Sequence, residues 1–293
     1  MPGGGAALGG ASAPSEGALV AFTLLEAAAW GTVLAALALG GAGNPACAGC
    51  AAAMATAGMA ASVFHLAKPL RAPFSLRNLA SSWLSREILA VSCFWALLAA
   101  WLAAAAWGVA AALAAALASF AGGGVLMAIV SKAYRVAARP AWAGPEGLLE
   151  LCGMAAGTGP AVAMACLAAD GATWMPLAAA GLMAAGLALD VAAHRTRRAR
   201  LASDEGFGAE PTRENYRRLW GRVGRCWAAG GVLLAGAAVV AAASAFGLFA
   251  GSGPLPAFLW AALAAGELAV HARLRSVFYE LPAQGRYVAR LKR

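Results

Sequence analysis

Residues 109–131 read VAAALAAALASFAGGGVLMAIVS, and KAYRVAAR follows them at once at residues 132–139. The first run contains no charged residue and is long enough to cross a bilayer as a helix, which takes roughly 20 apolar residues. The second run contains three basic residues. Apolar runs separated by short connections recur along the chain, and this pattern predicts a protein that crosses a membrane several times.

The pattern predicts an all-α integral membrane protein with eight transmembrane helices. The expected spans lie near residues 17–40, 46–66, 87–107, 109–131, 147–169, 172–193, 227–250 and 255–272. All 22 Lys and Arg residues fall in the second, fourth and sixth connections and in the C-terminal segment, and the other connections contain none. Because basic connections stay in the cytoplasm, we expect both termini there, and multi-pass insertion in a bacterial inner (cytoplasmic) membrane.

The composition supports a membrane protein. The chain is 62% hydrophobic and 12% charged, and its mean hydropathy of +0.71 lies outside the range of soluble proteins. The net charge of +9 lies in the connections, where it can contact anionic lipid head groups, so we expect membrane lipid and no nucleic acid as a partner. Residues 1–16 are expected to form a flexible N-terminal tail without the features of a cleaved signal peptide, and residues 273–293 a basic C-terminal tail.

The eight-helix membrane domain, residues 17–272, divides into similar halves at 17–145 and 146–272. Each half has four spans, so the halves share one orientation, and we predict two four-helix bundles side by side. The basic connection at 194–226 is expected to hold a short surface helix at most. Abundant Ala and Gly indicate either close helix packing or a composition bias. Five Trp residues near span ends are expected to be interface anchors: Trp101, Trp107, Trp142, Trp174 and Trp220.

Polar residues concentrate in FHLAKPLRAPFSLRNLASSWLSREIL, residues 64–89. His65 ends the second span and Glu87 begins the third. Consecutive spans run antiparallel, so both side chains are expected near the same membrane face. The segment resembles the signature of the membrane-anchor subunit of anaerobic dimethyl sulfoxide reductase, the DmsC family. The matching elements are His65–Pro69, Arg71–Ala72, Asn78–Leu79 and Ser82–Glu87, with further matches at 19–23, at 266–267 and at Arg275, Phe278 and Tyr279. Ala67 departs from the family, which usually has Gly there.

The resemblance implies a respiratory anchor that oxidises menaquinol to menaquinone without haem. It also implies two partners, an iron–sulfur subunit and a molybdopterin catalytic subunit, which carry the clusters and the molybdopterin. The matching quinol-site positions are His65 and Glu87. Quinol oxidation releases two protons, and an imidazole and a carboxylate can each accept one. We expect a surrounding shell of Arg71, Ser82, Trp83, Ser85 and Arg86.

Other readings of these residues remain. Glu87 can complement the dipole at a helix N-terminus, and the arginines can serve topology alone. Glu26, near mid-membrane in the first span, is a candidate for a proton path. Glu267 with His271, and Asp190 with His194, are spaced i, i+4, which favours local hydrogen-bonded pairs.

The metal and cysteine content adds little. His194 and His271 could face each other across a bundle, but their spacing does not indicate haem. Cys47 and Cys50 form a lone CxxC that predicts no metal site, and whether they form a disulfide is left open.

Two alternative functions are kept: a small-solute or proton-coupled transporter using Glu26 and Glu267, and a purely structural anchor. One conflict also stands. The charge rule places the His65–Glu87 end of the helices in the cytoplasm. Reductases of the type that the chain resembles are often exported, which would place their catalytic subunits on the opposite side of the membrane. The sequence leaves open the membrane face of the catalytic subunits, the terminal acceptor and the oligomeric state.

Overall fold

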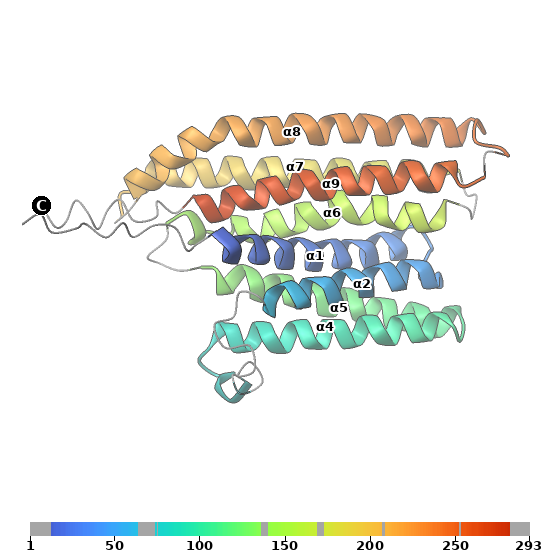
Figure 1. Ribbon diagram of the computed structural model, residues 1–293, viewed down its shortest axis with the longest axis horizontal. Coiled ribbons are helices and arrows are strands. Elements are labelled where there is room, and N and C mark those ends of the chain that lie inside the picture. Colours follow the sequence, from blue (N-terminus) through green and yellow to red (C-terminus); the bar gives the residue numbers. More distant parts are fainter. Residues whose placement is uncertain are drawn as a thin grey trace, which may run out of the picture.

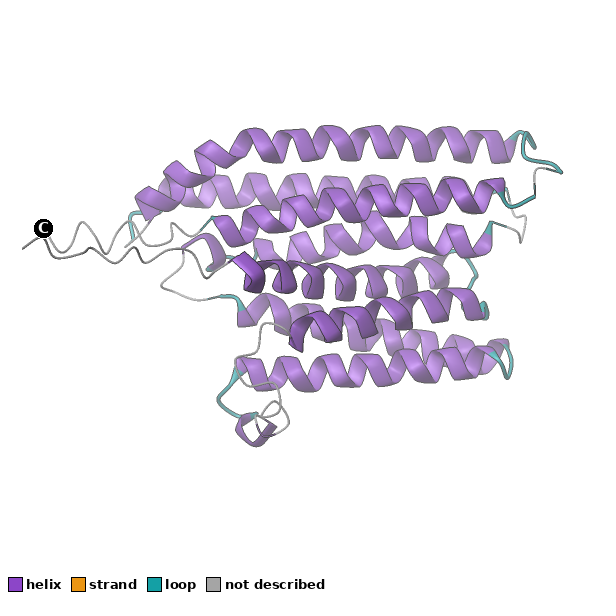
Figure 2. Ribbon diagram, in the orientation of Figure 1, coloured by secondary structure: helices purple, strands orange, loops and turns teal. Residues whose placement is uncertain are grey.

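The described part of the chain is built from helices, as a computed structural model shows (Figures 1 and 2). It covers residues 13–63, 74, 76–135, 140–168, 173–206, 209–251 and 253–281. The long helices are α1 (Ala13–Ala38), α2 (Pro45–Val63), α4 (Trp83–Ala105), α5 (Val109–Ala133), α6 (Glu146–Leu167), α7 (Met175–Ser203), α8 (Ala209–Ala245) and α9 (Leu255–Glu280). Two short 3₁₀ helices, η2 (Leu76–Asn78) and η3 (Pro140–Trp142), lie in the connections. All eight long helices are long and apolar enough to span a membrane, which confirms the predicted all-α membrane fold.

Several helices extend beyond the apolar runs. The expectation that residues 194–226 form a connection with a short surface helix at most is wrong, because α7 continues to Ser203 and α8 already begins at Ala209. α9 likewise ends at Glu280, beyond residue 272. Hydropathy marks only the part of a helix that lipid can surround, whereas Arg, Ala, Leu and Glu keep a high helix propensity in water. α1 begins at Ala13, and Pro14 is tolerated in its first turn.

The helices run side by side, with α8, α7, α9 and α6 in one half of Figure 1 and α1, α2, α5 and α4 in the other. In the first half α1 packs on α2, α2 on α4, α4 on α5 and α5 on α1. In the second half α6, α7, α8 and α9 close a similar ring. The packing of α1 on α6 between the halves is as extensive as packing within them. A division into two separate bundles therefore stays a prediction.

α6 is the central helix of the assembly, and small residues bring its neighbours close. A Cβ atom on Gly31 of α1 would overlap the backbone of Ala155, and a Cβ on Gly159 of α6 would overlap the backbone of Gly31. At this crossing the two backbones touch, which only glycine allows. Close packing therefore accounts for these glycines, whatever the composition bias of the chain.

The helix ends that carry the basic connections lie together at one end of the assembly, called here the basic end. α1, α4, α6 and α8 begin there and α2, α5, α7 and α9 end there (Figure 1). At the opposite end Trp107 and Trp174 are 80% and 51% exposed, as expected of interface anchors. Trp101 does not fit this expectation. It is fully buried, and its Nε1 donates to the carbonyl oxygen of Ala42 at 2.8 Å.

Candidate functional site

The structure describes only some residues of the predicted quinol site. His65 and Arg71 lie outside the described residues, whereas Glu87 is half-buried on α4 near the basic end. Ser82 is the N-cap of α4, and its hydroxyl accepts a hydrogen bond from the backbone N–H of Ser85 at 3.3 Å. Such a cap stabilises the first turn of a helix. These two serines therefore fix the start of the helix that carries Glu87.

Arg86 and Trp83 also form contacts at the N-terminal end of α4. The Arg86 guanidinium donates to the carbonyl oxygens of Leu79 and Ala80 at 2.8 and 2.6 Å, and it lies 4.4 Å from the Trp83 ring centre. Lys132 of α5 lies 5.7 Å from the same ring. Trp83, which the sequence places in the shell of the site, thus packs against two cations.

Glu87 is close enough to Arg275 of α9 and to Tyr134, at the end of α5, for electrostatic interaction with both. The Tyr279 hydroxyl donates to the Tyr134 hydroxyl at 3.0 Å. Burial, aided by Tyr279 and Glu87 and opposed by Arg275, holds the pKa of the Tyr134 phenol well above its usual value of 10. Tyr134 therefore stays a neutral hydroxyl beside Glu87 at physiological pH.

An aromatic cluster, formed by Tyr134, Trp142, Phe278 and Tyr279, surrounds these groups. Trp142 stacks on Phe278 with a centroid distance of 5.2 Å, and Tyr134 meets the Tyr279 ring edge-on at 5.8 Å. The Trp142 Nε1 donates to the carbonyl oxygen of Phe278 at 2.7 Å, so this partly buried tryptophan is tied to α9. Phe278 and Tyr279 are almost fully buried, so the rings of this cluster pack mainly on one another.

Arg275 links the aromatic cluster to a buried ionic cluster, formed by Glu150, His194, Arg197 and Arg275 and called here the Glu150 cluster. The Glu150 carboxylate forms ion pairs with Arg197 and with Arg275, the latter at 3.3 Å, and lies 3.5 Å from His194 Nε2. All four residues are at most 5% exposed. Burying a charge is costly unless it is paired, so the four side chains depend on one another.

Further hydrogen bonds anchor the Glu150 cluster to two other helices, α1 and α8. The Arg275 Nε donates to the Thr23 hydroxyl of α1 at 3.1 Å. The His194 ring lies 2.8 Å from the Tyr216 hydroxyl of α8, which also donates to the His194 carbonyl oxygen at 3.1 Å. The cluster therefore connects α1, α6, α7, α8 and α9 at the basic end.

A second buried set of polar side chains, formed by Asp190, Glu267 and His271, joins α7 and α9. His271 Nε2 lies 2.8 Å from Asp190 Oδ2, and its Nδ1 lies 3.4 Å from the Glu267 carboxylate. The expected local pair of Asp190 with His194 is wrong, because Asp190 bonds across to another helix. A Cβ on Gly157 of α6 would lie 2.6 Å from the His271 ring, so this glycine leaves the space that the ring occupies. The expected pairing of Glu267 with His271 is confirmed.

Glu26 stands apart from both groups. It is fully buried in α1, and among the described residues neither of its carboxyl oxygens has a hydrogen-bond partner. A Cβ on Gly58 of α2 would lie 2.9 Å from Glu26 Oε1, so Gly58 leaves room for the carboxyl group. A carboxyl group without partners at this depth is costly to bury.

The histidines and cysteines within the described ranges do not form a metal site. No group of three or more His, Cys, Asp and Glu side chains there could hold a metal ion. His194 and His271 use both ring nitrogens in contacts with protein groups. Cys47 and Cys50 lie on α2 and are both free thiols, and the Cys50 sulfur lies 3.7 Å from that of Cys166.

These features define a multi-pass helical membrane protein with a buried polar site at one end of its helices. A family model described as DMSO reductase anchor subunit (DmsC) matches residues 16–187, more than half of the chain. No curated protein and no solved structure matched. The chain belongs to the DMSO reductase anchor subunit family and is thus a membrane anchor of an oxidoreductase complex of that type.

The matched range includes Glu26, His65, Glu87 and Glu150, and it ends within α7. The partners of Glu150, namely His194, Arg197 and Arg275, lie beyond it. Sequence reasoning missed the Glu150 cluster. One signal for it was present, since Glu150 is an acidic residue one turn inside an apolar span.

Proposed function

We propose that this anchor binds menaquinol near Glu87 and oxidises it, passing the electrons to an iron–sulfur partner subunit and from there to a molybdopterin catalytic subunit. The observation that carries the proposal is the surroundings of Glu87. This carboxylate interacts with Arg275 and Tyr134, next to an aromatic cluster of a kind that can pack against a flat ring.

The chemistry requires two proton acceptors. Oxidation of the quinol breaks two O–H bonds and releases two electrons and two protons, leaving the quinone. His65 and Glu87 each take one proton in this proposal, and Arg71 belongs to the same shell. Ser82, Ser85 and Arg86 act indirectly, since they fix the first turn of α4 and thereby the position of Glu87. Glu26 is proposed to pass protons within the membrane.

The partner subunits belong at the basic end. Electrons leave the quinol from the ring, so the nearest iron–sulfur cluster has to lie close to Glu87. We propose insertion in a bacterial cytoplasmic membrane with both termini in the cytoplasm, because the basic connections gather at that end. The iron–sulfur subunit would then cover the cytoplasmic face of the anchor.

The test uses the purified complex and compares Glu87→Gln and His65→Ala with Glu214→Gln. Glu214 lies on α8, its side chain is 44% exposed, and within the described residues it forms ion pairs with the exposed Arg217 and Arg218. Loss of a proton acceptor is expected to lower quinol-driven reduction about 100-fold or more. Reduction driven by a dye that feeds the catalytic subunit directly should stay unchanged, as should subunit assembly.

Full quinol-driven activity in both site variants, with normal assembly, would refute the site. Unchanged dye-driven activity distinguishes the expected loss of quinol oxidation from a general loss of the complex. Uptake of a solute into vesicles that hold this chain alone would instead favour the transporter that Glu26 and Glu267 suggest.

A further inference from the structure

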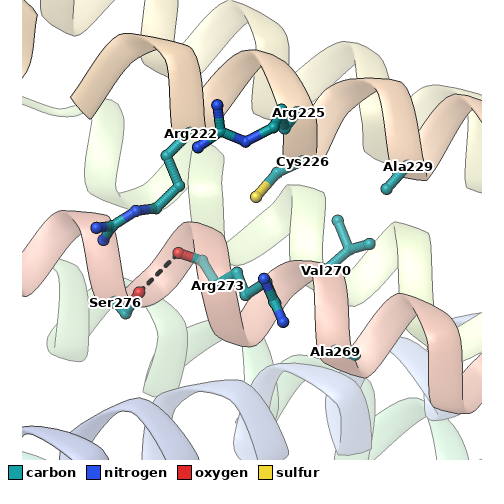
Figure 3. A pocket seen from close by; sticks show the side chains of 8 residues that line it. All are labelled: Arg222, Arg225, Cys226, Ala229, Ala269, Val270, Arg273 and Ser276. Carbon is teal, nitrogen blue, oxygen red and sulfur yellow. Dashed lines mark hydrogen bonds between the residues drawn. The ribbon is translucent and has the colours of Figure 1, made fainter. Parts of the chain in front are cut away.

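A cationic groove runs between α8 and α9 on the outer surface of the assembly, with a volume of about 560 Å³. Figure 3 shows Arg222 and Arg225 approaching it from α8 and Arg273 from α9. Both helices belong to the part of the chain beyond the family match. The groove is separate from the aromatic cluster and from the Glu150 cluster, since it shares no lining residue with either.

The charges of the groove are only partly compensated. The Arg222 guanidinium contacts both carboxyl oxygens of Glu280, at 2.6 and 2.7 Å. Arg225 and Arg273 are exposed, and within the described residues neither forms an ion pair. Residues 282–293, which follow α9, carry four basic residues and no acidic one, so their charge cannot compensate the groove.

The groove changes character along its length. Arg222, Arg273 and Ser276 line it toward the basic end, whereas Ala229 and Val270 line it toward the membrane interior (Figure 3). Small side chains leave space between the helices there. Farther along α8 the apolar surface continues, with Val232 72% exposed. A ligand that fits this groove has an anionic head and an apolar chain.

We infer that this groove binds an anionic phospholipid, with the phosphate at Arg225 and Arg273 and an acyl chain along Ala229 and Val270. Guanidinium groups bind phosphate oxygens through charge-assisted hydrogen bonds. Basic residues near a membrane surface also attract anionic head groups, by roughly 1 kcal/mol each, which corresponds to about a fivefold change in affinity. The position at the basic end matches the depth of a head group, and the apolar part matches the depth of a chain.

Native mass spectrometry of the purified full-length chain tests this inference. The delipidated protein is titrated with phosphatidylglycerol, phosphatidylethanolamine or glycerol 3-phosphate. We expect phosphatidylglycerol to bind at least about tenfold more tightly than phosphatidylethanolamine, and glycerol 3-phosphate to bind weakly, because the groove needs both the charge and the chain. In the Arg225→Gln/Arg273→Gln variant, binding of phosphatidylglycerol should weaken about tenfold or more.

Two further variants keep the test specific. Arg218→Gln removes an exposed arginine that pairs with Glu214 outside the groove, and it should leave lipid binding unchanged. Ala229→Trp fills the apolar part of the groove without altering its charge, and it should also weaken the binding of phosphatidylglycerol. Equal binding of the two lipids, or equal losses in the Arg218 and the double variants, would overturn the inference. Tight binding of glycerol 3-phosphate would assign the groove to a soluble phosphate instead.

Discussion

Replacing Glu150 by Gln is expected to destabilise the protein strongly. Glutamine keeps the size and one carbonyl acceptor but removes the negative charge. Arg197 and Arg275 would then face each other across a neutral side chain, at 1% and 3% exposure. The Nε of Arg197 already has no hydrogen-bond partner among the described residues. The positive charge of Arg197 therefore depends on the Glu150 carboxylate for compensation.

The expected magnitude follows from burial. Removing one partner of a buried ion pair costs about 3–5 kcal/mol, because the other charge stays in a poorly solvating environment. Glu214 provides a matched control, since it also contacts two arginines, at 3.3 and 3.2 Å, but its side chain is 44% exposed against 6% for Glu150. Exposed pairs contribute about 0–1 kcal/mol. Glu214→Gln should therefore change stability by less than about 1 kcal/mol.

Equilibrium unfolding in mixed micelles, followed by the fluorescence of the ten tryptophans, measures both variants on one scale. The reasoning fails if Glu150→Gln loses no more free energy of unfolding than Glu214→Gln. A smaller loss would mean that water reaches Arg197 and Arg275 in the native protein. Combining Glu150→Gln with Arg275→Met should recover part of the loss, because the second change removes one uncompensated charge.

Two further predictions concern the helix interfaces. Gly157→Ala should destabilise the protein by about 1–3 kcal/mol, because its Cβ would lie 2.6 Å from the His271 ring. The control is Gly181→Ala, whose new Cβ would have no atom within 4 Å. In the same unfolding assay it should be neutral or stabilising by up to about 1 kcal/mol. Glu26→Met should raise the free energy of unfolding by about 1 kcal/mol or more, because it removes two buried oxygens that have no hydrogen-bond partner within the described part of the chain. A loss of stability in Glu26→Met would show that the carboxyl group has a partner after all.

The sequence was sufficient to predict an all-α fold with eight membrane-spanning helices. Apolar length and the one-sided placement of Lys and Arg predicted eight spans, because the bilayer imposes both a fixed thickness and a charge asymmetry. The same signals failed at the ends of α7 and α8. Residues 194–226 are too polar for lipid but remain good helix formers, and hydropathy cannot separate a loop from a helix that leaves the membrane.

The candidate site was predictable only in part. Glu87 was predicted from its motif, which is local in sequence. Arg275, Tyr134 and Glu150 meet through packing between α5, α6 and α9, and their contacts join residues more than 100 positions apart. Asp190 illustrates the limit, because its nearest histidine in sequence is His194 but its hydrogen bond goes to His271. Helical periodicity reports which residues share a face and not which neighbouring helix that face meets.

The direct backbone contact at Gly31 and Gly159 has a mechanical consequence. Where two main chains touch, neither helix can rotate or slide without steric overlap, so α1 and α6 form a rigid spine through the middle of the protein. In the proposed quinol reaction, any movement that admits the quinol or releases the quinone is expected in the outer helices, such as α4 and α5, of whose apolar spans only 33% is buried inside the protein. Glu87 lies on one of those outer helices, whereas Glu150 lies on the spine.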